Sequence, residues 1–137
     1  MKSRAAALVA LVVLAGCGGG GTLDEQGLEK EVESIQSFAA EGALLARDVA
    51  DGKSTVSFAR VHAGELAEQA AKLAQTLRTA QATPTVEDDV AQAAELAADV
   101  GRTLEEFEQA PGDAEQARGI QRKLEQLARD AKELAAA

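Results

Sequence analysis

The chain has 137 residues, a formal net charge of −9 and three aromatic side chains, all phenylalanine. This length suits a single domain, whose core must be aliphatic because Trp and Tyr are absent. The first sixteen residues hold two basic side chains and no acidic one, which leaves a formal charge of −11 for the rest. Such a charge repels phosphates and anionic lipid headgroups, so we expect no nucleic-acid partner.

The first residues have the composition of an export signal. Lys2 and Arg4 precede an uninterrupted apolar run over residues 5–15. As a helix this run would be about 17 Å long, whereas the hydrocarbon core of a bilayer is about 30 Å thick. The segment 1–16 is therefore predicted to be a signal peptide rather than a transmembrane helix.

The residues Leu14-Ala15-Gly16-Cys17 end this segment. They resemble the lipobox of bacterial lipoproteins. The resemblance implies cleavage before Cys17, a diacylglyceryl group on its thiol, acyl chains such as palmitate, and retention on the extracytoplasmic face of the cell membrane. It covers residues 1–17 and implies nothing about the remainder. The alternative is an ordinary signal peptide followed by an incidental cysteine.

Residues 17–22 would then be the lipidated cysteine and its glycine-rich tether. Gly18–Gly21 offer no side chains to pack, so this stretch is expected to be a linker. Each buried CH₂ of a lipid chain contributes about 0.8 kcal/mol, so two or three chains anchor a protein firmly. The predicted membrane contact is thus the lipid on Cys17.

Residues 23–137 repeat one hydrophobic pattern four times. Small or apolar residues recur at alternating steps of three and four, which places them on one stripe of a helix. The four stripes include Leu28, Val32, Ile35 and Ala39; Val56, Ala59, Ala63 and Leu66; Val90, Ala93, Ala97 and Val100; and Ile120, Leu124, Leu127 and Ala131. Flanking residues expected to widen the core are Phe38, Leu45, Phe58 and Leu96. The pattern predicts an all-α domain with helices near 23–51, 55–82, 86–110 and 114–135.

Capping and turn residues agree with these boundaries. A capping box of Thr22 and Glu25, and caps at Ser54, Thr85 and Asp113, are expected at the four helix starts. Gly52 follows the first helix, where a left-handed residue is favoured.

Short connections join antiparallel neighbours, so the predicted topology is an up-down-up-down four-helix bundle with an alanine-rich heptad core. The tether, the 83–85 loop and Ala137 should share one end, and the turns at Gly52 and Gly112 the other. The alternative is a helical hairpin or coiled coil that completes its core by dimerising. Monomer and homodimer both remain open.

The residue types that four-helix bundles use for chemistry are scarce. The chain has one His, His62, and one Cys, which belongs to the lipobox. There is no Glu-x-x-His pair for a di-iron site, no haem attachment motif and no set of zinc ligands. We expect no metal, no cofactor and no enzymatic activity.

One polar patch stands out where the first two helices turn back on each other. The two helices are expected to be antiparallel with their turn near residues 52–54, so residues whose numbers sum to about 105 should lie opposite each other. Gly42 should then meet Ala63, and Glu41 should lie within a turn of His62. Arg47 and Arg60 should lie nearby, toward the loop. One interpretation is a partner or ligand site; the other is a seam histidine satisfied by a carboxylate.

The expected function is that of a lipid-anchored, extracytoplasmic structural or protein-interaction module of the cell envelope, with an envelope protein as its partner. The alternative is a lipoprotein that binds a small ligand in a groove near Glu41 and His62.

Overall fold

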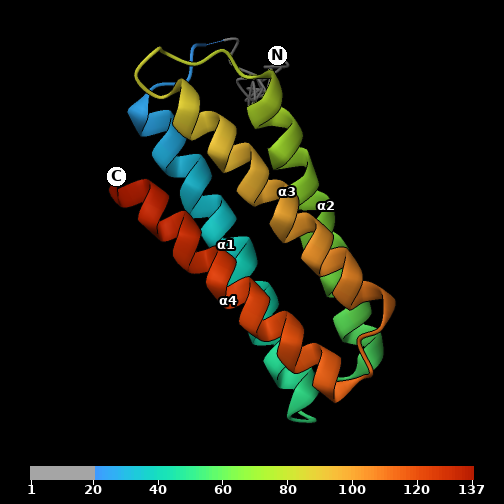
Figure 1. Cartoon of the computed structure of the whole chain (residues 1–137). Helices are drawn as coiled ribbons and strands as arrows, with labels where there is room; N and C mark the ends of the chain where they lie inside the picture. The colour runs from blue at the N-terminus through green and yellow to red at the C-terminus, as the bar shows by residue number, and fades with distance from the viewer. Residues whose placement is uncertain (1–20) are drawn as a thin grey trace, which may run out of the picture.

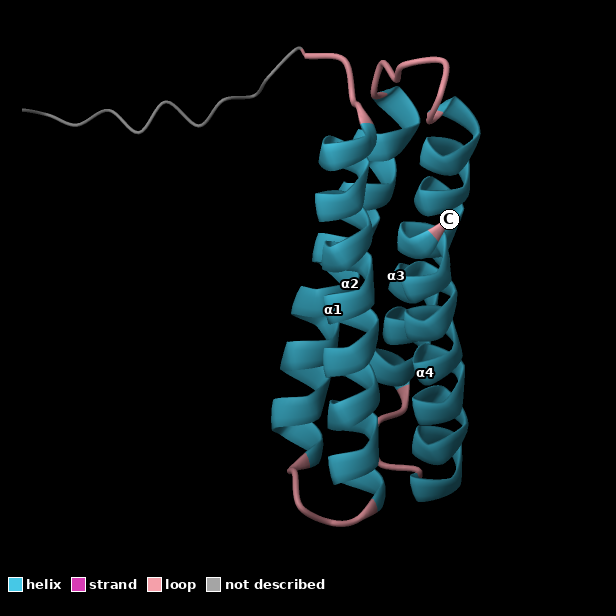
Figure 2. Cartoon of the chain, turned by 90° about the vertical axis from the view of Figure 1, so that its left-hand side faces the viewer, coloured by secondary structure: helices cyan, strands magenta, loops and turns pink. Residues whose placement is uncertain are grey.

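The computed structural model describes residues 21–137, so the predicted signal peptide and Cys17 lie outside the described residues. The described part forms four helices, α1 (Glu25–Ala50), α2 (Val56–Thr79), α3 (Glu87–Gln109) and α4 (Ala114–Ala136). They run alternately up and down in one elongated bundle (Figures 1 and 2). The predicted all-α fold is confirmed, and each predicted helix boundary falls within three residues of the observed one.

The ends of the bundle differ in what they hold. One end, here the proximal end, holds the α2–α3 loop and the last turns of α4 (Figure 1). Leu23 lies at the same end, bridged to the α2–α3 loop. The other, the distal end, holds the α1–α2 and α3–α4 turns (Figure 2). Gly52, in the α1–α2 turn, has φ of 71°, so the expectation of a left-handed residue there is confirmed.

The α1 cap differs from the expectation. Asp24, not Thr22, caps α1, and its carboxylate accepts a hydrogen bond from the Gly27 backbone at 2.9 Å. The helix cannot begin earlier because Leu23 is held in an extended bridge to the α2–α3 loop. The Leu23 N–H donates to the Gln81 carbonyl at 2.7 Å, and the Thr83 N–H donates to the Leu23 carbonyl at 3.0 Å.

The other three helix starts match the expectation to different degrees. At α2 the cap is Thr55 rather than Ser54, because Ser54 still belongs to the preceding turn and donates to the Asp48 carbonyl. At α3 the expected Thr85 cap is wrong, since Val86 precedes the helix and no side chain caps it. The Asp113 cap of α4 is confirmed, with bonds from the backbones of the second and third helical residues.

The core is aliphatic, as the composition requires. It combines the four predicted stripes with many alanines and the fully buried Phe107. Of the flanking residues, Leu45 and Leu96 are buried and Phe38 is partly buried, whereas Phe58 is exposed. Val56, expected in the second stripe, is exposed as well. Thr103 is the buried polar residue of the described part, and its hydroxyl donates to the Asp99 carbonyl at 2.7 Å.

The helices associate as two pairs. α1 packs most extensively against α4, and α2 against α3, whereas α1 and α2 share much less contact (Figure 1). The α2–α3 pair is close at Gly101, where an added Cβ would lie 3.5 Å from backbone atoms of both Ala67 and Ala71. The missing side chain of Gly101 and the small alanines opposite therefore allow α2 and α3 to approach closely at this point.

Gly42 has a different role from the one expected. A Cβ there would lie 2.5 Å from Leu104 Cδ2 and 3.0 Å from Leu124 Cδ1. The missing side chain thus makes room for leucines of α3 and α4, and no atom of Ala63 is among the three nearest to an added Cβ. The predicted register of α1 and α2 agrees with the contact between Glu41 and His62. The side chains that fill the space at Gly42, however, come from α3 and α4.

Candidate functional site

The candidate site forms where α1 and α2 lie level in the distal half of the bundle. His62 Nε2 lies 2.7 Å from Glu41 Oε1, which confirms the predicted pairing of these two residues. The short α1–α2 turn sets this register, because it leaves little freedom in how the two antiparallel helices slide past each other. The imidazole is about 30% exposed, so the pair lies at the helix seam rather than in the core.

Two further residues of α2 complete the cluster. His62 Nδ1 lies 3.6 Å from Glu65 Oε2, one turn further along the helix. The Phe58 ring, one turn earlier, stacks on the imidazole with centroids 5.5 Å apart and 20° between the planes. Neither contact was predicted from the sequence, although spacings of three and four residues on one helix signal such neighbours.

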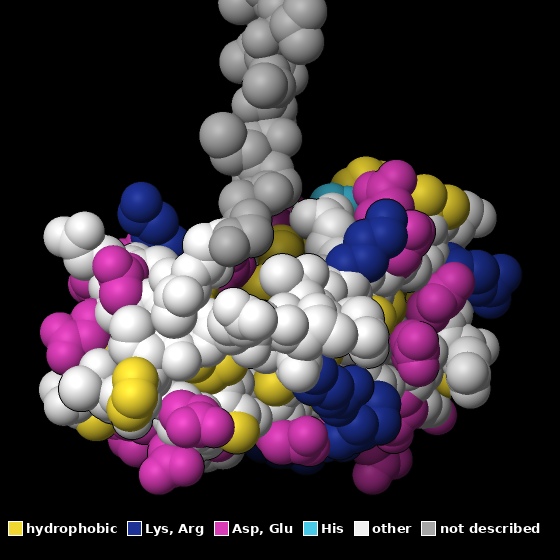
Figure 3. All heavy atoms as spheres, turned by 90° about the horizontal axis from the view of Figure 1, so that it is seen from above, with side chains coloured by type: hydrophobic (Ala, Val, Ile, Leu, Met, Phe, Trp, Pro, Cys, Tyr) yellow, Lys and Arg dark blue, Asp and Glu magenta, His cyan; other side chains and the backbone are white. Residues whose placement is uncertain are grey.

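The exposure of Phe58 follows from the helical position of this residue. Ala59 and Ala63 face the core, and Phe58 lies about 100° around the helix from Ala59. Its ring therefore covers His62 and leaves 58% of the residue exposed. In the view from above, hydrophobic and acidic side chains appear next to the cyan histidine (Figure 3).

The two arginines of the predicted patch lie apart from this cluster. The Arg47 guanidinium lies 3.7 Å from the Asp48 carboxylate and lines a hollow between α1 and α4. Arg60 is exposed on α2, and within residues 21–137 neither arginine forms an ion pair or hydrogen bond with Glu41 or His62. The patch is therefore acidic and aromatic around one histidine, rather than mixed in charge.

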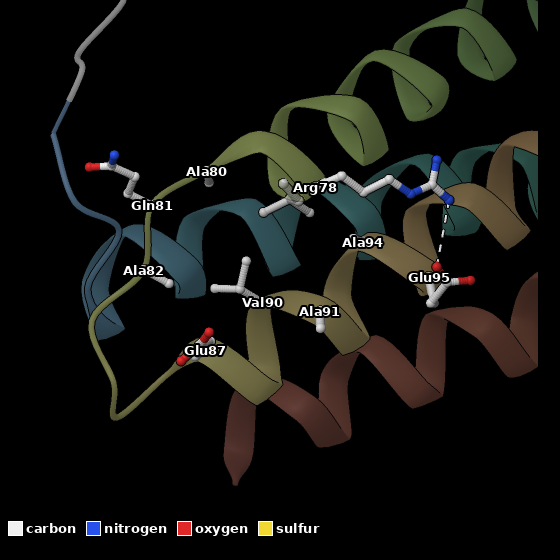
Figure 4. Close-up of a pocket in the computed structure, with 10 residues that line it drawn as sticks. Arg78, Ala80, Gln81, Ala82, Glu87, Val90, Ala91, Ala94 and Glu95 are labelled. Atoms are coloured by element: carbon white, nitrogen blue, oxygen red, sulfur yellow. Dashed lines mark ion pairs between the residues drawn. The ribbon is translucent and has the colours of Figure 1, made fainter.

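The larger hollows of the described part lie elsewhere. An open groove of about 510 Å³ runs between the end of α2 and the start of α3, with Leu77 and Val90 among its lining residues (Figure 4). Arg78 reaches across it toward Glu95, with 3.6 Å between guanidinium and carboxylate (Figure 4). A second hollow, of about 430 Å³, lies between the ends of α1, α3 and α4. Neither is lined by Glu41 or His62.

The described residues offer no arrangement of three or more His, Cys, Asp or Glu side chains suited to hold a metal ion. In the same part of the chain, no helix combines the length and apolar character needed to cross a membrane. In the cluster itself, an imidazole lies between two carboxylates and supports an aromatic ring. This arrangement orders hydrogen-bond donors, acceptors and one apolar surface, which are the elements of molecular recognition.

No protein-family model matches the chain, and neither a curated protein nor a solved structure shows a significant match.

Proposed function

We propose that the protein is a lipid-anchored, non-catalytic structural or interaction module on the extracytoplasmic face of the cell membrane. The observation that carries this proposal is the order of basic residues, apolar run and Leu14-Ala15-Gly16-Cys17 at the start of the chain. The lipid on Cys17 supplies the membrane attachment, and residues 23–137 supply the surface that other envelope components meet.

The geometry of the bundle supports this arrangement. The chain enters the fold at Leu23, whose backbone is hydrogen-bonded to the α2–α3 loop at the proximal end. An anchor at Cys17 therefore holds the proximal end toward the membrane. The distal half, about a helix length away, is turned toward potential partners.

The ligand-binding alternative has less support. A small-molecule site needs a cavity on which a few polar groups converge. Glu41 and His62 instead hydrogen-bond to each other at a helix seam, and the larger hollows lie elsewhere. We therefore favour an interaction surface over a ligand pocket.

Metabolic labelling with a fatty-acid analogue tests the anchor. Wild-type protein should be labelled and should fractionate with membranes. Cys17→Ala should lose the label, because the thiol that accepts the lipid is gone, and should remain uncleaved or be released. Equal labelling of the two proteins would refute the lipoprotein assignment.

Crosslinking in intact cells tests the module itself. A partner should crosslink to residues of the distal half and not to matched positions at the proximal end. Catalytic turnover by the purified protein would contradict the non-catalytic part of the proposal.

A further inference from the structure

Exposed apolar side chains gather on the first two turns of α2. Val56, Phe58 and Val61 are 42%, 58% and 63% exposed. Phe58 and Val61 are three residues apart and share a helix face directed away from the core stripe. Single exposed hydrophobic residues are common on protein surfaces, whereas Phe58 and Val61 lie side by side and together offer a larger apolar area.

The aromatic member of this pair is held in place. Phe58 stacks on His62, which is fixed across the seam by Glu41 and faces Glu65 on its own helix. A ring held this way loses little further freedom when a partner covers it. Ordered aromatic side chains at the centre of a contact are the usual anchors of an interface.

Negative charge borders the pair. Glu41 and Glu65 each contact His62, half or more of each side chain is exposed, and neither is paired with Lys or Arg in the described part of the chain. Glu68, further along α2, is different, because its hydrogen bond with Lys72 lowers its pKa and occupies its carboxylate. Glu41 and Glu65, the carboxylates beside Phe58, therefore contact His62 but no Lys or Arg of the described part.

The charge of the chain and the area of the exposed apolar surface together indicate what kind of partner would cover Phe58 and Val61. The chain beyond residue 16 has a formal charge of −11, so a second copy and anionic lipid are both repelled, whereas a cationic partner is attracted. An exposed Phe and Val offer on the order of 200 Å² of apolar surface, against about 800 Å² per partner in a standard stable interface. This surface is suited to a short segment rather than to self-association.

We propose that the surface formed by Phe58, Val61, Glu41 and Glu65 docks a cationic amphipathic segment of another polypeptide. Its apolar side chains cover Phe58 and Val61, and its Lys or Arg side chains reach the two carboxylates. The inference rests on the proposed function, since it names the partner chemistry of that interaction module.

A defined probe tests this surface on the full lipidated chain in neutral phosphatidylcholine vesicles. The probe is a synthetic helical peptide with leucine on one face and lysine on the other; a second peptide has glutamate in place of lysine. Fluorescence anisotropy measures binding, with empty vesicles as the blank. Phe58→Ser/Val61→Ser and Glu41→Gln/Glu65→Gln should each weaken binding of the lysine peptide about tenfold.

Two variants serve as matched controls. Leu44→Ser removes a comparably exposed side chain that lines the α1–α4 hollow, and Glu29→Gln/Glu133→Gln makes the same charge change at the proximal end. Both should bind the lysine peptide like the wild type. The glutamate peptide should not bind saturably, and added salt should weaken binding of the lysine peptide.

Several outcomes would overturn the proposal. One is equal binding of both peptides, and another is unchanged binding by the two surface variants when circular dichroism shows them folded. Binding that empty vesicles reproduce would assign the effect to lipid. A dimer that dissociates in Phe58→Ser/Val61→Ser would make a second copy the occupant. Fatty-acid labelling of Cys17 is scored separately, so labelled protein that ignores the peptide refutes this surface and leaves the anchor standing.

Discussion

At the scale of single residues, His62 shows how a partly exposed histidine is used at a helix seam. Its two ring nitrogens face carboxylates of different helices, and its face supports Phe58. Ion pairs this exposed contribute little to stability, because solvent screens them and ordering the side chains costs entropy. The cluster therefore orients side chains more than it stabilises the fold.

We expect His62→Gln to lower the free energy of unfolding by no more than about 1 kcal/mol, since glutamine keeps a donor toward Glu41. Urea unfolding followed by circular dichroism measures the change. Glu65→Gln, whose contact with the ring is longer at 3.6 Å, should change stability less. A loss of several kcal/mol for His62→Gln would show that the cluster is part of the core.

Gly42 and Gly119 form a matched pair of helical glycines with opposite expectations. Alanine at Gly42 places a Cβ 2.5 Å from the fully buried Leu104, which has little room to move, so we expect a loss of about 1 kcal/mol despite the better helix propensity. Gly119 has nothing within 4 Å of an added Cβ, so Gly119→Ala should gain about 0.5–1 kcal/mol. Thermal unfolding of both variants gives the comparison. A gain at Gly42 would mean that the leucines repack freely.

At the scale of elements, the first residue of a helix depends on the hydrogen bonds that the preceding residues make. Leu23 is engaged with the α2–α3 loop, so α1 begins after Asp24, whose carboxylate binds the Gly27 backbone. Asp24→Ala should cost about 1 kcal/mol through the lost cap. Thr22→Ala, at the position first expected to cap, should change the midpoint of urea unfolding very little. The opposite order of effects would restore the Thr22 capping box.

The buried stripes make a sharper prediction for each helix. Leu104 is fully buried in α3, so Leu104→Asp should unfold the bundle, because an unpaired charge would replace a core side chain. Leu66→Asp in α2 and Leu127→Asp in α4 should act in the same way. Leu44→Asp, at a position that is 48% exposed, should keep its helical circular dichroism. Retained helix in all three core variants would contradict the stripe assignment.

At the scale of the whole molecule, one chain supplies all the helices that bury the described core. A complete core needs no second copy to form. The unfolding midpoint of the fragment that begins at Gly18 should therefore not change with protein concentration. A midpoint that rises with concentration would favour a homodimer.

Much of this architecture was determined by local sequence pattern. A period of 3.5 residues shows which face of each helix is buried. Gly52 marks a boundary through its backbone conformation, and Asp113 marks one through its side-chain cap. The Glu41–His62 pair was predictable because a short turn sets the register of two antiparallel helices. The lipobox was read in the same local way from Leu14 to Cys17, and it stays a prediction.

Only the tertiary structure decided which helices pair and what fills each space. A stripe shows which side chains are buried but not which neighbour covers them. Which side chains fill the space at Gly42 therefore depends on the summed volumes of segments far apart in the chain. The same holds for Leu23, whose bridge to residues 81–83 shifted the start of α1. These contacts join residues distant in sequence, so no local period contains them.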